Sequence, residues 1–257
     1  MTRTRTIAVT LIVIAAIAVG GYIAWDQVLR GDDVASLALP SSAPSADTAG
    51  TAGTAPTLAP AASSPADSST APSSDGSVAG EWAVGAGSVA GYRVREHLAN
   101  LPAESDAVGR TEDVSGSITV ADDGGAASLT AGTLTVDTTT IQSDESRRDN
   151  RLRSEGLQTD QYPTATFKVT QPVAVPAAAL TGTASDITLV GDLTLHGVTK
   201  SVQIPAQAQL ADGKIQVAGT LTFPLSDFGI TPPNVGGFIL SISDQGTLEF
   251  LVSFEKA

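Results

Sequence analysis

Few residues in this chain have the types and spacing that catalysis or metal binding requires. The sequence contains two histidines, His97 and His196, and no cysteine. A nucleophilic mechanism needs a side chain activated by a base that a third group orients, and neither a Gly-x-Ser-x-Gly pattern nor a phosphate-binding loop occurs. Two histidines without cysteine also supply few metal ligands. We therefore expect no enzymatic activity, no metal and no cofactor, and keep hydrolysis centred on His196 only as a minor alternative.

Two charged clusters each have a functional and a simpler explanation. Asp122-Asp123-Gly124-Gly125 could begin a calcium loop, but this composition is typical of a hairpin turn. Arg147, Arg148, Arg151 and Arg153 could receive a pyrophosphate head group, since guanidinium matches phosphate geometry. A solvated, salt-paired helix face is the simpler explanation of the four arginines. The net charge of −13 argues against a nucleic-acid partner, which would need clustered basic residues.

Alternating apolar and polar residues predict the strands that would position an apolar site. In residues 185–223, three period-two segments are separated by His196-Gly197 and Asp212-Gly213, which are typical of tight hairpin turns. Residues 143–154 break the period, and oppositely charged residues four apart, such as Asp144 and Arg148, favour one short helix there. Further strands are predicted at 81–84, 89–97, 114–120, 127–136, 164–169 and 246–254.

Eight or nine short strands of this kind fit an all-β domain, a closed antiparallel barrel, with a two-sheet sandwich as the alternative. Small residues on its apolar faces, Gly116, Gly191, Ala206, Ala208 and Gly219, would leave space for a slim ligand, although glycines can equally serve to bend strands. The candidate ligand-binding residues are Tyr92, Val94, Ile118, Leu134, Phe167, Gly191, Leu193, Ala206, Gly219, Phe223, Phe228, Phe238 and Phe250.

The N-terminal third of the chain differs from this domain in composition. Residues 7–25 carry no charge, approach the roughly 20 residues that span a bilayer, and follow Arg3 and Arg5. Residues 1–30 are therefore predicted to form a cytoplasmic stub and a transmembrane signal anchor, with a cleaved signal peptide as the alternative. Residues 31–79, rich in Ala, Ser, Thr and Pro, are predicted to be a disordered linker. Residues 80–257 would then form an extracytoplasmic domain on a single-pass cell-membrane anchor.

Six sequence runs in this domain resemble the YceI-like family of lipocalin-like polyisoprenoid carriers. They are GSVAGYRVREHL (87–98), VGRTEDVSGSITV (108–120), LTVDTTTIQSDESRRD (134–149), YPTATFKVT (162–170), GDLTLHGVTKSV (191–202) and LSDFGITPP (225–233). The resemblance implies an eight-stranded antiparallel lipocalin-like barrel with one short helix and a long apolar cavity. Many members begin with His-Ser where this chain has Gly87-Ser88, so no role of that histidine carries over.

These observations predict a membrane-anchored protein that sequesters or carries a long apolar lipid of the polyisoprenoid type. An apolar cavity would bind such a chain by burial, at about 0.8 kcal/mol per CH₂ group. The alternative is a cell-envelope interaction module whose barrel is filled by its own side chains and whose outer surface binds a partner. The sequence leaves the oligomeric state open, with a dimer as one alternative.

Overall fold

The structure, a computed structural model, describes residues 34–40, 77–98, 104–122, 126–232 and 239–257. The predicted membrane span at 7–25 and the candidate residue Phe238 lie outside these ranges. Within them, no helix is both long enough and apolar enough to cross a bilayer.

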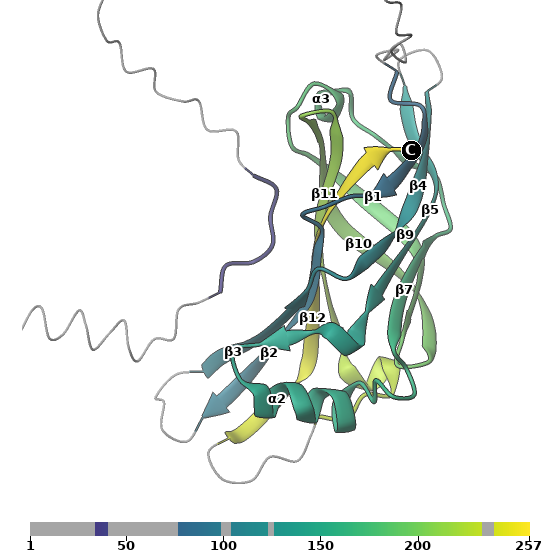
Figure 1. Ribbon diagram of the computed structural model, residues 1–257. Coiled ribbons are helices and arrows are strands. Elements are labelled where there is room, and N and C mark those ends of the chain that lie inside the picture. Colours follow the sequence, from purple (N-terminus) through teal and green to yellow (C-terminus); the bar gives the residue numbers. More distant parts are fainter. Residues whose placement is uncertain (1–33, 41–76, 99–103, 123–125, 233–238) are drawn as a thin grey trace, which may run out of the picture.

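Eight antiparallel strands close into a barrel (Figure 1). The ring runs in the order β1-β4-β5-β7-β9-β10-β11-β12 and is closed by pairing between β12 and β1. The closed ring confirms the predicted barrel over a two-sheet sandwich. Its strands are β1 (Gly80–Val84), β4 (Val114–Asp122), β5 (Ala127–Asp137), β7 (Thr164–Val169), β9 (Ser185–Leu195), β10 (Val198–Ala211), β11 (Lys214–Pro224) and β12 (Ile239–Lys256).

The two predicted hairpin turns have the backbone conformation that their sequences require. His196 and Gly197 have φ values of 51° and 74°, and Asp212 and Gly213 have 52° and 72°. Positive φ at both central residues belongs to the turn whose twist matches that of the flanking strands. These turns fix the registers of β9 with β10 and of β10 with β11.

A three-stranded extension of the sheet was not predicted in full. β2 (Val89–Leu98) pairs with β12 on one side and with β3 (Glu104–Thr111) on the other, and β3 pairs with the short β6 (Gln142–Ser143). β3 was missed because its sequence, ESDAVGRT, mixes polar and small residues on both faces and does not alternate clearly. β12 is also longer than the predicted strand at 246–254. Its first residues, from Ile239, pair with β2 before the pairing with β11 begins at Gln245.

The predicted helix at 143–154 is shorter than expected and changes type along its length. α2 (Ser146–Arg151) continues into the π-helical turn η2 (Leu152–Gly156), and the side chain of Glu145 caps the first turn of α2. The Asp144–Arg148 pair is formed, whereas Asp149 accepts hydrogen bonds from Ser143. The remaining short elements are η1 (Thr138–Thr140), β8 (Val173–Ala174), α3 (Ala177–Leu180) and η3 (Leu225–Phe228).

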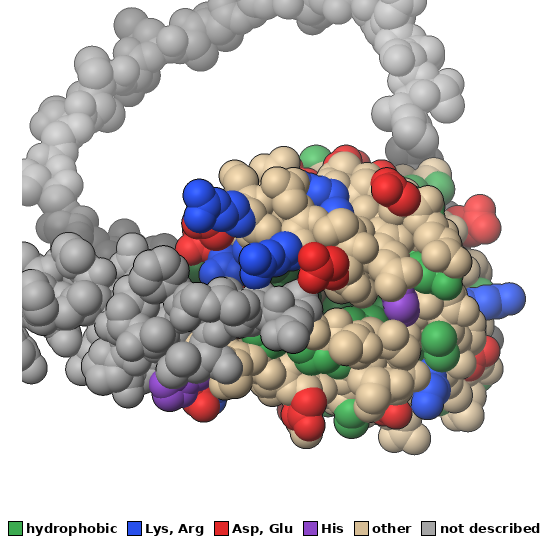
Figure 2. Space-filling view, turned by 90° about the horizontal axis from the view of Figure 1, so that it is seen from below, with side chains coloured by type: hydrophobic (Ala, Val, Ile, Leu, Met, Phe, Trp, Pro, Cys, Tyr) green, Lys and Arg blue, Asp and Glu red, His purple; other side chains and the backbone are tan. Residues whose placement is uncertain are grey.

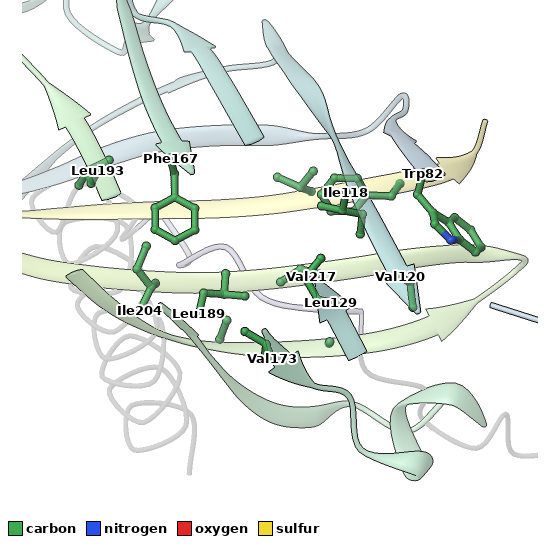
Figure 3. Packing of buried hydrophobic residues seen from close by; sticks show 14 of the residues in the cluster. Trp82, Ile118, Val120, Leu129, Phe167, Val173, Leu189, Leu193, Ile204 and Val217 are labelled. Carbon is green, nitrogen blue, oxygen red and sulfur yellow. The ribbon is translucent and has the colours of Figure 1, made fainter. Parts of the chain in front are cut away.

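The end of the barrel away from α2 is filled by its own side chains. Figure 3 shows Trp82, Val120, Leu129, Val173 and Val217 among the residues that gather inside this end. Side chains from the segment containing β8 and α3 pack against the same cluster.

Residues 34–40 lie against the outside of the sheet, within the stretch predicted to be a disordered linker. The backbone oxygens of Val34 and Ala35 accept hydrogen bonds from Arg93 of β2 and Arg110 of β3. Leu39 is buried, at 9% exposed. The prediction of disorder was based on the low hydrophobicity of residues 31–79 as a whole. Averaging over this stretch hides the short apolar run VASLALP, in which Leu39 is buried.

Candidate functional site

An apolar cavity of about 430 Å³ occupies the half of the barrel next to α2. This volume lies in the range of small-molecule sites, which are mostly apolar with a few polar groups. Seven of the candidate residues from the sequence line it: Tyr92, Val94, Leu134, Phe167, Leu193, Phe223 and Phe250.

The burial of successive inward-facing residues along β12 marks where the cavity ends. Leu248 and Phe250 line the cavity and are only half-buried. Val252, the next residue on this face, borders the end of the cavity at 1% exposed, and Phe254 beyond it is 2% exposed. The alternative of a barrel filled by its own side chains therefore describes one half of this barrel, and the half beside α2 is hollow.

The other candidate residues do not line this cavity. Ile118 borders only a small void of about 30 Å³ in the filled half. Phe228, in η3, is 1% exposed and packs edge-to-face on Phe223, with ring centroids 5.0 Å apart. Gly191, Ala206 and Gly219 are buried in the barrel wall.

The glycines of the wall do not create the cavity, because aromatic rings lie directly over them. A Cβ atom on Gly191 would be 2.7 Å from Cζ of Phe167, and one on Gly219 would be 2.7 Å from Cζ of Phe250. The prediction that these glycines leave volume unfilled was therefore wrong. Instead they let the rings of Phe167 and Phe250 lie flat against the sheet, so that the rings form the inner surface of the wall.

The cavity reaches the surface beside α2. Its lining includes the exposed residues Glu145, Arg147 and Arg151, together with Leu152 and Pro232. Figure 2 looks onto this end of the molecule, where charged side chains gather at the edge and apolar side chains are visible toward the middle. The site thus combines an apolar interior with a polar rim.

A buried ion pair connects α2 to the sheet at this rim. Nη2 of Arg148 lies 3.3 Å from Oε2 of Glu96, whose side chain is 5% exposed. Arg148 also pairs with the exposed Asp144, and the neighbouring Glu96 carboxylate keeps the pKa of Arg148 above its usual value despite the opposing effect of burial. This pair holds α2 over the end of the barrel.

The four arginines of this region divide into two groups. Arg148 is salt-paired, and Nη2 of Arg153 donates to Oδ1 of Asn150 at 3.0 Å. Arg147 and Arg151 form no ion pair with any described residue and line the opening. Salt pairing therefore accounts for Arg148 and a neutral hydrogen bond for Arg153, whereas Arg147 and Arg151 remain open to a ligand.

Tyr92 lines the cavity and carries a buried hydroxyl group. Its oxygen is buried and makes no hydrogen bond with any described residue. Burial, opposed by the charge of Arg148 and reinforced by Asp149 and Glu96, raises the pKa of Tyr92 from 10.0 to about 12. The hydroxyl therefore stays protonated well above neutral pH.

The two histidines serve structure in this fold. Nδ1 of His196 lies 3.1 Å from the backbone oxygen of Phe228, and its ring meets Tyr162 edge-on at 4.6 Å between centroids. His97 lies on β2, paired with Glu104 of β3. Among the described residues, no group of three His, Asp or Glu side chains is arranged to hold a metal ion.

Several cavity residues were not among the sequence candidates. They include Ala107 on β3, Leu152 and Leu157 after α2, and Ile230 and Pro232 after η3. The leucines carried a signal, since an apolar residue at the end of a charged helix must face a protein surface. Ala107 carried none, because its strand was not recognised.

The chain is similar to known proteins in sequence and in fold. The family model of the YceI-like domain matches residues 84–254. Comparison with curated proteins finds no match. A polyisoprenoid-binding domain from Saccharophagus degradans, implicated in plant cell wall breakdown, is 18% identical, with a TM-score of 0.50 over 70% of this chain and 99% of that one.

Two further solved structures are similar. BcnA of Burkholderia cenocepacia is 17% identical, with a TM-score of 0.46 over 64% of this chain and 95% of that one. The YCEI protein of Campylobacter jejuni is 20% identical, with a TM-score of 0.43 over 58% of this chain and 85% of that one. The family match covers well over half of the chain and coincides with the described barrel, so this protein belongs to the YceI-like family.

Proposed function

We propose that this protein binds a long apolar lipid in the cavity beside α2 and sequesters or carries it. The observation that carries the proposal is the cavity itself, about 430 Å³ with a predominantly apolar lining inside a closed barrel. Burying an alkyl or isoprenoid chain there is favourable by about 0.8 kcal/mol per CH₂ group. Such binding requires no bond-making step.

The finer proposal is a polyisoprenoid-type lipid. It is supported by the resemblance of the sequence runs and by the Saccharophagus degradans relative, which is described as a polyisoprenoid-binding domain. The lipid's polar end would lie at the rim, where Arg147 and Arg151 can meet negative charge.

We also propose that the barrel is held outside the cytoplasm by a single-pass anchor. The support is in the sequence: residues 7–25 carry no charge, and Arg3 and Arg5 precede them. A protein that exchanges lipid with a membrane benefits from staying beside it. Alkaline extraction and protease treatment of intact cells test the anchor and its orientation separately from lipid binding.

Native mass spectrometry of the purified full-length protein tests lipid binding. We expect a co-purifying lipid that is released by organic extraction and identified as an isoprenoid. A protein that is repeatedly purified without lipid, and takes none up from mixed micelles, would contradict the proposal and favour a surface-binding envelope module instead.

A matched pair of variants tests whether the lipid occupies this cavity. Ala165 of β7 is half-buried and lines the cavity, whereas Ala131 of β5 is exposed on the outside. Ala165→Phe should displace several lipid CH₂ groups and reduce lipid affinity by about 2–3 kcal/mol, roughly 30- to 150-fold. Ala131→Phe should leave lipid binding unchanged. Equal occupancy in the two variants would place the ligand elsewhere.

A further inference from the structure

We propose that the outer face of β2, β3 and β12 is a peptide-binding site, and that its occupant is this chain's own segment Val34–Pro40. The site lies on the opposite side of the barrel wall from the lipid cavity. It goes beyond lipid binding, because it concerns how the chain before the barrel is attached to it. Three features of the structure support the proposal: a buried charge cluster, its hydrogen bonds to the segment, and a buried leucine.

The charge cluster is built around Glu249 of β12. Its side chain is 1% exposed, and Glu249 alternates along β12 with Leu248 and Phe250, the inward-facing residues that line the cavity. Oε1 accepts from Nε and Nη2 of Arg110, at 2.9 and 2.7 Å, and Oε2 lies 3.6 Å from Nη2 of Arg93. Nη1 of Arg93 donates to Oδ2 of Asp106 at 3.1 Å. Both guanidinium groups are therefore held in place by carboxylates on the sheet.

The remaining donors of these two arginines meet the segment's backbone. Nη2 of Arg93 donates to the oxygen of Val34 at 2.6 Å, and Nη2 of Arg110 donates to the oxygen of Ala35. Two successive carbonyl groups are thus recognised by donors whose positions are already fixed. Pre-positioned donors reduce the side-chain entropy that binding must otherwise cost.

Side chains of the segment supply the selectivity that backbone contacts lack. Leu39 is buried at 9% exposed and Leu37 is half-buried, whereas Ala38 between them is exposed. This alternation is that of an extended peptide with one face on a surface. The site therefore fits an extended peptide with two leucines separated by one residue. Two backbone carbonyl groups before the leucines accept the hydrogen bonds of Arg93 and Arg110.

Covalent connection favours the chain's own segment over any other peptide. Residues 41–76 join Pro40 to Ser77, which lies three residues before the start of β1, so both ends of that stretch are attached to the barrel. If residues 41–76 form the linker that their composition predicts, the effective concentration is on the order of millimolar, so even a weak site would be occupied. If residues 7–25 are the proposed anchor, only residues 26–33 separate them from the site, a reach of at most about 30 Å.

Limited proteolysis of the full-length protein in detergent tests the site without reference to lipid. Thermolysin cleaves before leucine, and the Ser36–Leu37 bond lies within the segment. We expect this bond to be cut at least about tenfold more slowly in the protein than in a synthetic peptide of residues 31–45, because cleavage follows the population of the released form.

Two sets of variants show whether the protection comes from this site. Arg93→Gln combined with Arg110→Gln should restore cleavage to nearly the peptide rate, and Arg95→Gln, on the same strand but not bonded to the segment, should not. Within the segment, Leu39→Ser should accelerate cleavage and Ala38→Ser should not, each rate being compared with that of its own peptide. This second pair decides the question if the double arginine variant fails to fold by circular dichroism.

Cleavage of the unchanged protein at the peptide rate would overturn the proposal. So would slow cleavage that neither Leu39→Ser nor the double arginine variant accelerates. Lipid content measured on the same samples keeps this result separate from the proposed lipid binding, because the segment and the cavity are on different faces of the wall.

Discussion

Replacing Tyr92 with phenylalanine should remove much of the protein's loss of stability at high pH. Burial raises the pKa of Tyr92 to about 12, against 10.0 for an unburied tyrosine. Below pH 10 the hydroxyl is protonated in both the folded and the unfolded protein. Between pH 10 and 12 the unfolded protein releases this proton and the folded protein retains it. The unfolded state then binds fewer protons, so the free energy of unfolding falls as pH rises.

The size of the effect follows from the difference between the two pKa values. Each pH unit in this window costs up to about 1.4 kcal/mol, so the folded protein loses roughly 2 kcal/mol by pH 11.5 through this residue. The Tyr92→Phe variant lacks the proton and should lose only what the other titrating groups contribute. Guanidinium denaturation of both proteins at several pH values between 8 and 11.5 measures the difference.

At pH 7 the same substitution should be neutral or stabilising. The hydroxyl makes no hydrogen bond with any described residue, so its removal breaks none. Loss of a buried unpaired group is worth up to about 1 kcal/mol. Destabilisation by more than about 1 kcal/mol at pH 7, or parallel pH curves for the two proteins, would refute the reasoning. Arg148→Gln should shift the tyrosinate absorbance of Tyr92 to higher pH, because it removes the positive charge that lowers this pKa.

Three further substitutions test the rim, the wall and the filled half, all by guanidinium denaturation at pH 7. Glu96→Gln should cost about 1–3 kcal/mol, less than a fully buried pair because Arg148 can turn to Asp144, while the exposed Glu104→Gln should cost under about 1 kcal/mol. Gly191→Ala should lower the free energy of unfolding by about 1–3 kcal/mol, because the new Cβ would lie 2.3 Å from the backbone oxygen of Lys168. An unchanged stability would show that the strands of the barrel wall can move apart to accept the methyl group. Trp82→Ala should cost about 3–5 kcal/mol yet leave lipid content unchanged, and loss of lipid would mean that the two halves are coupled.

The parts of the fold that depend on local alternation could be predicted from the sequence. The meander from β9 to β11 followed from period-two patterning and from His196-Gly197 and Asp212-Gly213, whose turn conformation depends on those residue types. The closed barrel followed from the number of short strands and from the need to remove sheet edges. β3 could not be found this way, because pairing with β2 rather than its own pattern makes it a strand.

The site could be predicted only in part, because cavities depend on how rings lie across strands. Aromatic and aliphatic residues on inward faces, such as Tyr92 and Phe250, were recognised as lining residues from their alternation. Which glycines are covered depends on register, since Phe250 lies opposite Gly219, and no local pattern encodes that relation. The hollow half could likewise not be distinguished from the filled half, since both present apolar residues with the same period.

The division of the barrel into a hollow and a filled half has a consequence for the order of exchange. Because Trp82 and its neighbours fill one end of the described barrel, a lipid bound as proposed would enter and leave past α2. The portion that enters first is then the last to come out. A lipid inserted tail-first would present its head group to whatever membrane or protein receives it, so a receiver would recognise the head group before any hydrocarbon leaves the barrel.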